Sequence, residues 1–379
     1  MSLSANIFPR TMALSGNPIR LDIVSSSPVT YTIAVGSEVI YEGSAEEGNL
    51  GIFIDEILSA IVEPTRYTGQ ETDFILETSG NIKQYTIDIT NTEGDTKTLQ
   101  HKVVLGGISK RAMRHLNQEG SNIFTFKLLN AAGNFFMSAR SETRTLAIRE
   151  TELRPLLFIA PKTEFTVTVT EGMAKVIEGL TIGQCYALNL EALRRHFFDT
   201  ENVLVNQFVV STDEGEAVTI VISPSAIEKE RYYLEFLNSY GNYECIDVSG
   251  KPKLEQDTGE EETYGKYDEL VNDYVESRER LRTVDTIHVQ TGFKTGKELL
   301  FLLDMLSSDS IYLLGYEDRE IKVNASADSL AIAKTMGQPQ SLPITLRFAD
   351  SEKHFTQALR GDDFGDPRIH TQEFSKEFN

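Results

Sequence analysis

The segment Gly292–Glu298, with the sequence GFKTGKE, is the part of this chain that comes closest to a phosphate-binding loop. The pattern is one residue short, and Glu298 stands where a Ser or Thr would hold magnesium. A carboxylate at that position would repel phosphate. Thr295 and Glu298 instead have the spacing of a capping box, in which each side chain satisfies a backbone N–H at the start of a helix. We therefore expect a helix start here and no nucleotide site.

Signatures of metal binding and of nucleophilic catalysis are missing from the sequence. Cys185 and Cys245 have apolar, strand-like neighbours, which predicts two reduced, packed thiols rather than a disulfide. No Gly-x-Ser-x-Gly elbow occurs. We expect no enzyme, no cofactor and no metal site. A carbohydrate-active hydrolase stays as a third alternative, because the two acids of a glycosidase are set by distance in space and not in sequence. The six histidines lie far apart, with no pairing at metal-ligand spacing: His101, His115, His196, His288, His354 and His370.

The net charge of the chain limits the kinds of partner that we expect. It has 57 acidic and 36 basic residues, a net charge of −21. Nucleic-acid binding draws most of its affinity from Lys and Arg on phosphates, so we expect no nucleic-acid partner. No segment approaches the roughly 20 apolar residues that span a bilayer, and residues 1–20 lack an apolar run behind a basic start. We therefore expect no membrane insertion and synthesis in the cytoplasm of the host cell.

An acidic run between Ser249 and Glu269 is punctuated by glycine and proline. Its like charges repel, which favours an exposed linker or loop. A calcium site is the alternative, because carboxylates suit that ion, but the Asp-x-Asx-x-Asx-Gly spacing is missing.

Two groups of residues are candidate subunit contacts. The turn Gly106-Gly107 leads into a short helix capped by Ser109 that carries a basic cluster, unusual in so acidic a chain. This cluster is either a solvated helix face or a surface that pairs with an acidic patch, such as residues 255–269, on an adjacent copy. The polar segment 360–379 carries isolated phenyl rings that could dock into a neighbour. The candidate contacts are Lys110, Arg111, Arg114, Phe364, Phe374 and Phe378.

Five short motifs occur twice in the same order, which predicts two copies of one fold. The offset between copies is nearly constant at first and falls later, as unequal loops would require. The pairs are Tyr31–Val35 with Phe165–Val169, Glu42-Gly43 with Glu178-Gly179, Ile57-Leu58 with Ala192-Leu193, Glu93-Gly94 with Glu214-Gly215, and Leu129–Asn134 with Leu237–Asn242.

Alternating apolar residues predict strands through both copies, including one over Ile123–Leu129, and each copy has one helix, near residues 54–61 and 189–197. The fold class is mainly β with short helices: tandem Ig-like β-sandwich modules, two or three in number, with extended terminal arms. The predicted organisation is an N-terminal arm over 1–20, modules over 21–150 and 151–250, an acidic linker or loop over 251–269, a divergent α+β module over 270–358, and a C-terminal arm over 359–379.

The third module is predicted from a weaker match, that of Leu299–Phe301 with Leu156–Phe158. Its helix begins at the capping box, and its apolar residues fall at helical spacing. We expect a buried helix face made of Leu299, Leu302, Leu303 and Leu306.

Several turns and helix starts are shared with a known group of proteins. They are Ser15–Ile19 ahead of the first strands, Phe236–Gly241, and Thr291–Phe293 ahead of the helix from Glu298. With these, residues 15–350 resemble structural, tail- or virion-associated proteins of tailed bacteriophages and prophages of Bacteroidetes. Members often carry Trp before the Leu-Asn turn, where this chain has Phe236 and no Trp at all.

The resemblance implies a non-enzymatic structural subunit of a bacteriophage virion, in the tail, the baseplate or a portal-proximal ring. Its partners would be itself, in a homo-oligomeric ring, and other virion proteins. The alternative is a receptor- or glycan-binding adhesin, in which exposed aromatic rings stack on sugars. The candidate rings are Tyr240, Tyr243, Tyr264 and Tyr267.

Overall fold

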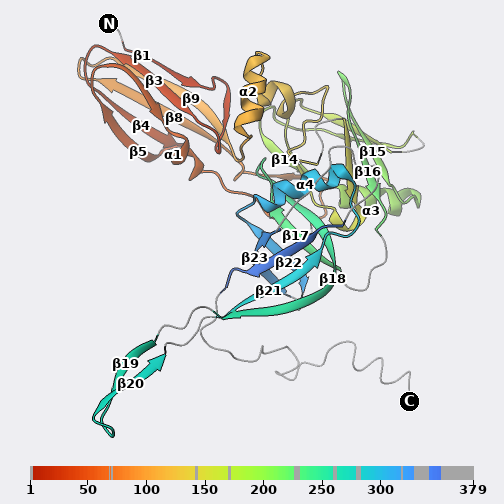
Figure 1. Ribbon diagram of the computed structural model, residues 1–379. Helices are drawn as coiled ribbons and strands as arrows, with labels where there is room; N and C mark the ends of the chain where they lie inside the picture. Colours follow the sequence, from red (N-terminus) through yellow and green to blue (C-terminus); the bar gives the residue numbers. More distant parts are fainter. Residues whose placement is uncertain are drawn as a thin grey trace.

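The computed structural model describes residues 3–67, 69, 71–140, 144–169, 172–225, 231–258, 263–278, 283–316, 319–327 and 341–350. In these ranges the protein is mainly β and is built from several sheets with short helices (Figure 1). Two sandwiches are followed by a closed barrel and a projecting hairpin. None of the helices in the described ranges has the length and apolar content needed to cross a membrane.

The first sandwich packs a five-stranded sheet against a three-stranded one. Along β4, Val29, Tyr31 and Ile33 are buried, and the residues between them are more exposed, as the two-residue period of a strand requires. Ile54 and Leu58 of the predicted helix close the core. The five-stranded sheet has the order β2 (Met12–Leu14), β9 (Thr96–Val104), β8 (Ile82–Asn91), β4 (Val29–Val35), β5 (Glu38–Ala45). The three-stranded sheet has the order β1 (Ser4–Phe8), β3 (Arg20–Ser25), β6 (Gly48–Phe53). Helix α1 (Asp55–Ser59) follows β6.

Residues 4–14 belong to this sandwich and do not form an extended arm. Ala5 and Ile7 of β1 alternate with exposed residues and are buried in the core, and β1 pairs along its full length with β3. Strand β2 pairs in parallel with β9, and its three residues are all buried. The predicted arm is thus held by apolar side chains that are too sparse to stand out in the sequence.

The second sandwich has the same plan with its own core. Its strands carry the same alternation, and α3 is capped by Asn189, whose side chain accepts a hydrogen bond from the Ala192 N–H. The five-stranded sheet has the order β10 (Thr145–Arg149), β16 (Gly215–Ser223), β15 (Gln207–Thr212), β12 (Phe165–Val169), β13 (Ala174–Ile177). The three-stranded sheet has the order β11 (Leu156–Ile159), β14 (Cys185–Leu188), β7 (Ile75–Glu77). Helix α3 (Leu190–Glu201) follows β14.

The two large sheets have equivalent strand orders. Taken in chain order, β2, β4, β5, β8 and β9 correspond to β10, β12, β13, β15 and β16, and both sheets begin with a parallel pair at the same edge. Three of the five repeated motifs fall on equivalent elements, and a fourth is displaced, since Glu42-Gly43 lies in β5 and Glu178-Gly179 directly follows β13. The fifth is wrong, because Leu129–Asn134 follows a helical turn and Leu237–Asn242 joins β17 to β18. Asn130 and Asn238 each accept a hydrogen bond from the N–H two residues ahead, so that match reports turn chemistry alone.

The two sandwiches are joined by a shared strand and a shared core. Strand β7 lies between α1 and β8 in the chain, yet it pairs with β14 of the second sandwich. A further apolar cluster takes Leu14 and Val104 from the first sandwich, Leu157 and Ala187 from the second, and Phe124 between them. The linked units therefore cannot move independently without breaking sheet hydrogen bonds.

The segment predicted as a strand over Ile123–Leu129 is a π-helical turn, η1 (Phe124–Leu128), after α2 (Lys110–Gln118). The Asn122 side chain accepts hydrogen bonds from the N–H groups of Phe124 and Thr125, which starts a helical turn. Phe124 and Leu128, four residues apart, are then buried on one side. A short apolar run does not by itself distinguish the two structures.

The last part of the chain forms a closed, fully antiparallel barrel and not a third copy of the sandwich. It begins at β17, so the second sandwich ends near residue 223 and not at the predicted 250. Leu156–Phe158 lies in strand β11 and Leu299–Phe301 in helix α4, so their match is not structural. The barrel order is β17 (Arg231–Leu237), β18 (Tyr243–Thr258), β21 (Thr283–Gln290), β24 (Pro343–Phe348), β23 (Arg319–Ser326), β22 (Ile311–Tyr316).

Helix α4 (Gly296–Leu306) joins β21 to β22 and packs Phe301, Leu302 and Met305 into the barrel core. The predicted capping box is confirmed, with both reciprocal hydrogen bonds between Thr295 and Glu298 in place. The predicted apolar face is wrong at Leu303, which is 41% exposed because the buried stripe runs through Met305 instead.

The predicted acidic linker is largely β structure. Strand β18 runs to Thr258 and pairs with β21, since backbone pairing does not depend on side-chain charge. Beyond it, β19 (Thr263–Asp268) and β20 (Asp273–Arg278) form a two-stranded hairpin. Figure 1 shows this hairpin standing away from the barrel, at the opposite end of the molecule from α2.

Candidate functional site

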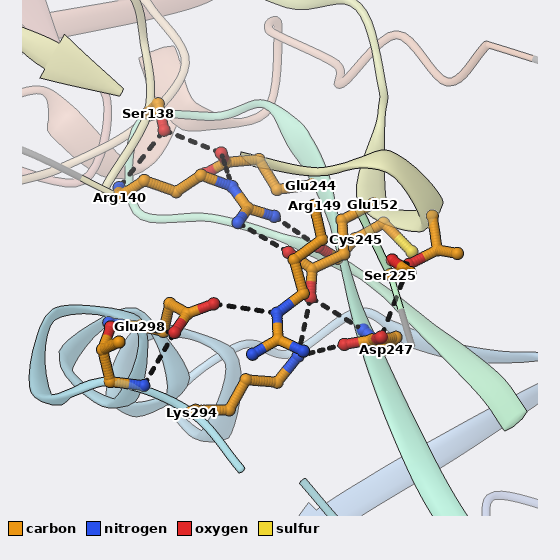
Figure 2. Close-up of polar contacts among 12 residues, drawn as sticks. Ser138, Arg140, Arg149, Glu152, Ser225, Glu244, Cys245, Asp247, Lys294 and Glu298 are labelled. Atoms are coloured by element: carbon orange, nitrogen blue, oxygen red, sulfur yellow. Dashed lines mark hydrogen bonds and ion pairs between the residues drawn. The ribbon is translucent and has the colours of Figure 1, made fainter. Parts of the chain in front are cut away.

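A cluster of buried charges lies where the second sandwich meets the barrel (Figure 2). Lys294, just before α4, is 1% exposed and donates a hydrogen bond of 2.8 Å to Oε1 of Glu152, in the turn after β10. Lys294 also forms an ion pair with Asp247 of β18. Arg140 contacts Glu152 at 2.8 Å and Glu244 of β18 at 3.3 Å. Each of the three carboxylates is therefore paired with a cation, and Glu152 is paired with both Arg140 and Lys294.

The surroundings shift the pKa values of these acids in different directions. Burial alone raises the pKa of Glu152, but the positive charges of Arg140 and Lys294 outweigh it and hold this pKa well below its usual range. Burial raises the pKa of Glu244 despite Arg140. Burial and the adjacent Glu152 raise the pKa of Asp247, although Lys294 opposes them. The cluster therefore holds one firmly ionised carboxylate and two that accept protons more readily.

The geometry of the cluster suits a structural lock better than an acid–base site. A catalytic acid must reach a substrate, and Glu152, Asp247 and Lys294 are all buried. Arg149 extends the lock toward α4, donating to Glu298 at 2.9 Å and to the Phe293 carbonyl at 2.8 Å. These contacts join the two units through oriented ion pairs.

A close backbone contact joins the barrel to the first sandwich as well. The Gly107 N–H donates to the Ser239 carbonyl at 2.7 Å, and Asn81 Nδ2 donates to the Gly241 carbonyl at 2.7 Å. Gly106, at φ +125°, leaves no room for a side chain, because a Cβ there would lie 2.7 Å from the carbonyl carbon of Tyr240. The two sandwiches and the barrel therefore form one block.

Helix α2 borders an apolar groove that we call the α2 groove. Ser109 caps the helix as predicted, and Lys110, Arg111 and Arg114 are exposed on it. In the described part of the chain none of these three cations forms an ion pair. The groove has a volume of about 360 Å³ and continues into a shallower hollow edged by Lys110 and Arg114. Its apolar lining includes Phe8, Leu14, Ile108, Met113, Leu116 and Phe124.

The tip of the β19–β20 hairpin is the most exposed apolar point among the described residues. Leu270 is 98% exposed and Val271 is 63% exposed. Asp268 accepts a hydrogen bond from the Leu270 N–H at 2.8 Å, and Asn272, at φ +51°, closes the turn and bonds to the Tyr267 hydroxyl. The tip is thus shaped by its own polar groups while its apolar side chains face water.

The acidic residues of the hairpin surround this apolar tip. Asp268 and Asp273 form the last pair of the ladder, and Glu269 begins the turn. Tyr267 and Tyr274, opposite each other, contact edge to face with ring centroids 5.5 Å apart. The apolar tip could not be predicted from the sequence, because Leu270-Val271 is only two residues long.

Other residues predicted from the sequence have mixed outcomes. Tyr264 and Tyr267 are exposed, whereas Tyr243 is buried, with its ring near Arg66, and Tyr240 is half-buried. Cys185 and Cys245 are both free and buried, as predicted. Burial raises the pKa of each thiol to about 12. The described residues contain no group of His, Cys, Asp and Glu that could hold a metal ion. Phe364, Phe374 and Phe378 lie outside the described residues.

Comparisons with known proteins give no family for this chain. No family model and no curated protein sequence matches it. Among solved structures, a bacterial ice-binding adhesin of 1.5 MDa studied for host cell surface retention is 10% identical, over 76% of this chain and 92% of the other, with a TM-score of 0.16. A Ca²⁺-stabilised adhesin of an ice-binding Antarctic bacterium is 8% identical, over 92% and 98%, with a TM-score of 0.15.

A third structure is SGBP-B of the Bacteroides ovatus mixed-linkage glucan utilization locus, in complex with a mixed-linkage heptasaccharide. It is 8% identical, over 73% of this chain and 70% of the other, with a TM-score of 0.16. TM-scores at this level carry no argument about the present protein.

Proposed function

We propose that this protein is a non-enzymatic structural subunit that works by self-association. The observation that carries the proposal is the β19–β20 hairpin, which presents Leu270 and Val271 to water. A two-stranded hairpin is marginally stable alone in water, and exposed apolar groups of this kind mark interaction sites. The hairpin gains a stable environment when a partner covers its tip.

The modules of the subunit are, in this proposal, two Ig-like sandwiches and a barrel. The order β9-β8-β4-β5 against β1-β3-β6 is that of strands G, F, C and C′ against A, B and E in an immunoglobulin-like sandwich. The second sandwich repeats the order with β16-β15-β12-β13. Such modules serve as rigid spacers, which suits a component that sets the distance between subunits.

The place of assembly in this proposal is a bacteriophage virion, in the tail, the baseplate or a portal-proximal ring. What supports it is the resemblance of the turn and helix-start motifs in residues 15–350 to virion-associated proteins of Bacteroidetes phages and prophages. Imaging of purified phage particles with this chain labelled tests the placement. Absence of the label from intact particles would contradict it.

The mass of the full chain, measured by sedimentation from nanomolar to high micromolar concentration, tests self-association. We expect the mass to rise with concentration, and Leu270→Asp to hold the chain at the monomer mass over the same range. The matched control is Leu204→Asp, which places the same charge on another exposed leucine, outside the hairpin. A wild-type chain that stays monomeric throughout would refute the proposal.

A glycan-binding adhesin is the second candidate, favoured by the exposed pair Tyr267 and Tyr274. Their rings lie on one face of the hairpin, and exposed aromatic rings of this kind can stack on sugars. A glycan panel tests this candidate. Binding that Tyr274→Ala abolishes, in a chain that remains monomeric, would favour the adhesin over the structural subunit.

A further inference from the structure

We infer that the hairpin tip of one copy inserts into the α2 groove of a neighbouring copy. The inference rests on the proposed self-association and names its two contacting surfaces. The tip offers two apolar side chains, Leu270 and Val271, on a preformed turn. The α2 groove offers an apolar lining that includes Ile108, Met113 and Leu116.

The charges of the two surfaces are opposite. Asp268, Glu269 and Asp273 surround the tip. Lys110 and Arg114 edge the hollow that continues the α2 groove. These two cations form no ion pair within the described residues, in a chain whose net charge is −21. Complementary charge around an apolar centre steers the encounter of two surfaces and fixes their register.

The same two surfaces lie far apart within one chain. Figure 1 places the hairpin and α2 at opposite ends of the molecule. The lock at Lys294 and the contact at Gly106 hold α2 and the barrel, from which the hairpin projects, on one block. A contact between two different surfaces of identical subunits is heterologous, and it generates a ring when the rotation closes or a filament when it does not.

The turn that carries the tip lowers the cost of docking. Hydrogen bonds from the Leu270 N–H to Asp268 and from the Tyr267 hydroxyl to Asn272 hold the turn before a partner arrives. A preformed ligand loses less conformational freedom on binding than a flexible one. The groove is also preformed, because Leu14, Leu116 and Phe124 in its wall are buried in the monomer.

Disulfide trapping in the full chain tests the inference. The native thiols of Cys185 and Cys245 are buried, so the background of cross-linking is low. The double variant Leu270→Cys/Met113→Cys should form a ladder of covalent multimers under mild oxidation, and reductant should collapse it. An equimolar mixture of the two single variants should form dimers only, because each chain then carries one reactive thiol.

Charge reversal gives a second, independent readout. Lys110→Glu/Arg114→Glu should raise the dissociation constant of self-association by about tenfold or more, since like charges then face each other. Glu269→Lys/Asp273→Lys, which leaves the Asp268 hydrogen bond of the turn in place, should restore the affinity when it is added to the same chain. Recovery by the opposite reversal shows that both variants fold.

Three outcomes would overturn the inference in distinguishable ways. In the first outcome, the chain is oligomeric by mass and dissociates with Leu270→Asp, but it gives no ladder and its affinity is unchanged by the reversal at Lys110 and Arg114. The tip then docks elsewhere, and the proposed function stands without this contact. Equal dimer yield from Leu270→Cys alone would mean that tip meets tip. A chain that is monomeric at every concentration refutes the inference together with the proposed function.

Discussion

The charged junction and the projecting hairpin place their side chains in opposite ways. At the junction, Lys294 and Glu152 are removed from water and each is paired with an opposite charge. At the hairpin, Leu270 and Val271 face water and acidic residues surround them. The junction has all its partners inside the chain, whereas the apolar tip of the hairpin has none among the described residues.

This difference separates the junction, which fixes how the units are oriented, from the hairpin, which contacts a partner in the proposed assembly. Buried ion pairs contribute little net stability compared with apolar packing, but their directionality fixes how two units meet. The hairpin lies between β18 and β21 of the barrel in chain order. The junction thus orients the units of the block, and the apolar tip lies outside that block.

The largest expected effect is at the junction, where Lys294→Ala should lower the free energy of unfolding by about 3–5 kcal/mol. The reason is that Glu152 and Asp247 would lose their shared cation while they remain buried. Urea denaturation at pH 7 measures the change. The control is Lys162→Ala, which removes a lysine paired with Asp213 and Glu214 at the surface and should leave stability unchanged. Equal responses of the two variants would erase the distinction between junction and surface.

A pH series sharpens the same point at Glu152. The pKa of Glu152 is depressed in the folded protein, so its stabilising contribution is present above the unfolded value of about 4.3 and is lost as the pH falls through the folded pKa. Glu152→Gln should therefore destabilise the protein by roughly 1.5–3 kcal/mol at pH 7. The difference from wild type should shrink below about pH 4. A difference that grows toward acid would contradict the assignment of Glu152 as the ionised member.

The contact between the barrel and the first sandwich predicts a smaller loss. Gly106→Ala should cost more than about 1 kcal/mol, because the residue has a positive φ and the added Cβ would meet the Tyr240 backbone. Gly36→Ala is the matched control, since Gly36 also has a positive φ but has open space around it. The difference in unfolding free energy between the two variants isolates the contact. Equal losses would mean that backbone strain alone accounts for Gly106.

The repeated sandwich could be predicted from the sequence because its motifs report local rules. Strand alternation at Tyr31–Val35 and Phe165–Val169, and the glycines of equivalent turns, depend on neighbours a few residues away. The same locality misled the match of Leu129–Asn134 with Leu237–Asn242, where both asparagines form the same turn in different surroundings. Local chemistry identifies elements, but it does not say which elements are equivalent.

The junction and the α2 groove could not be predicted in the same way. Lys294, Glu152 and Asp247 are separated by scores of residues, and nothing about each one alone distinguishes a buried charge from an exposed one. The basic cluster at Lys110 and Arg114 was predicted from its contrast with the acidic chain. The apolar groove beside it required the fold, because β1, α2 and η1 contribute its walls together.

The smallest expected effect is that of Leu270→Asp on the monomer. At a concentration below that of self-association, the variant should change the free energy of unfolding by no more than about 0.5 kcal/mol, because Leu270 is 98% exposed. At high concentration the wild type should gain stability from association by mass action, and the variant should not. Thermal unfolding of both chains over a concentration series measures this divergence. Parallel curves at all concentrations would mean that the exposed tip has no partner in a second copy, and the hairpin would then differ from the junction in exposure alone.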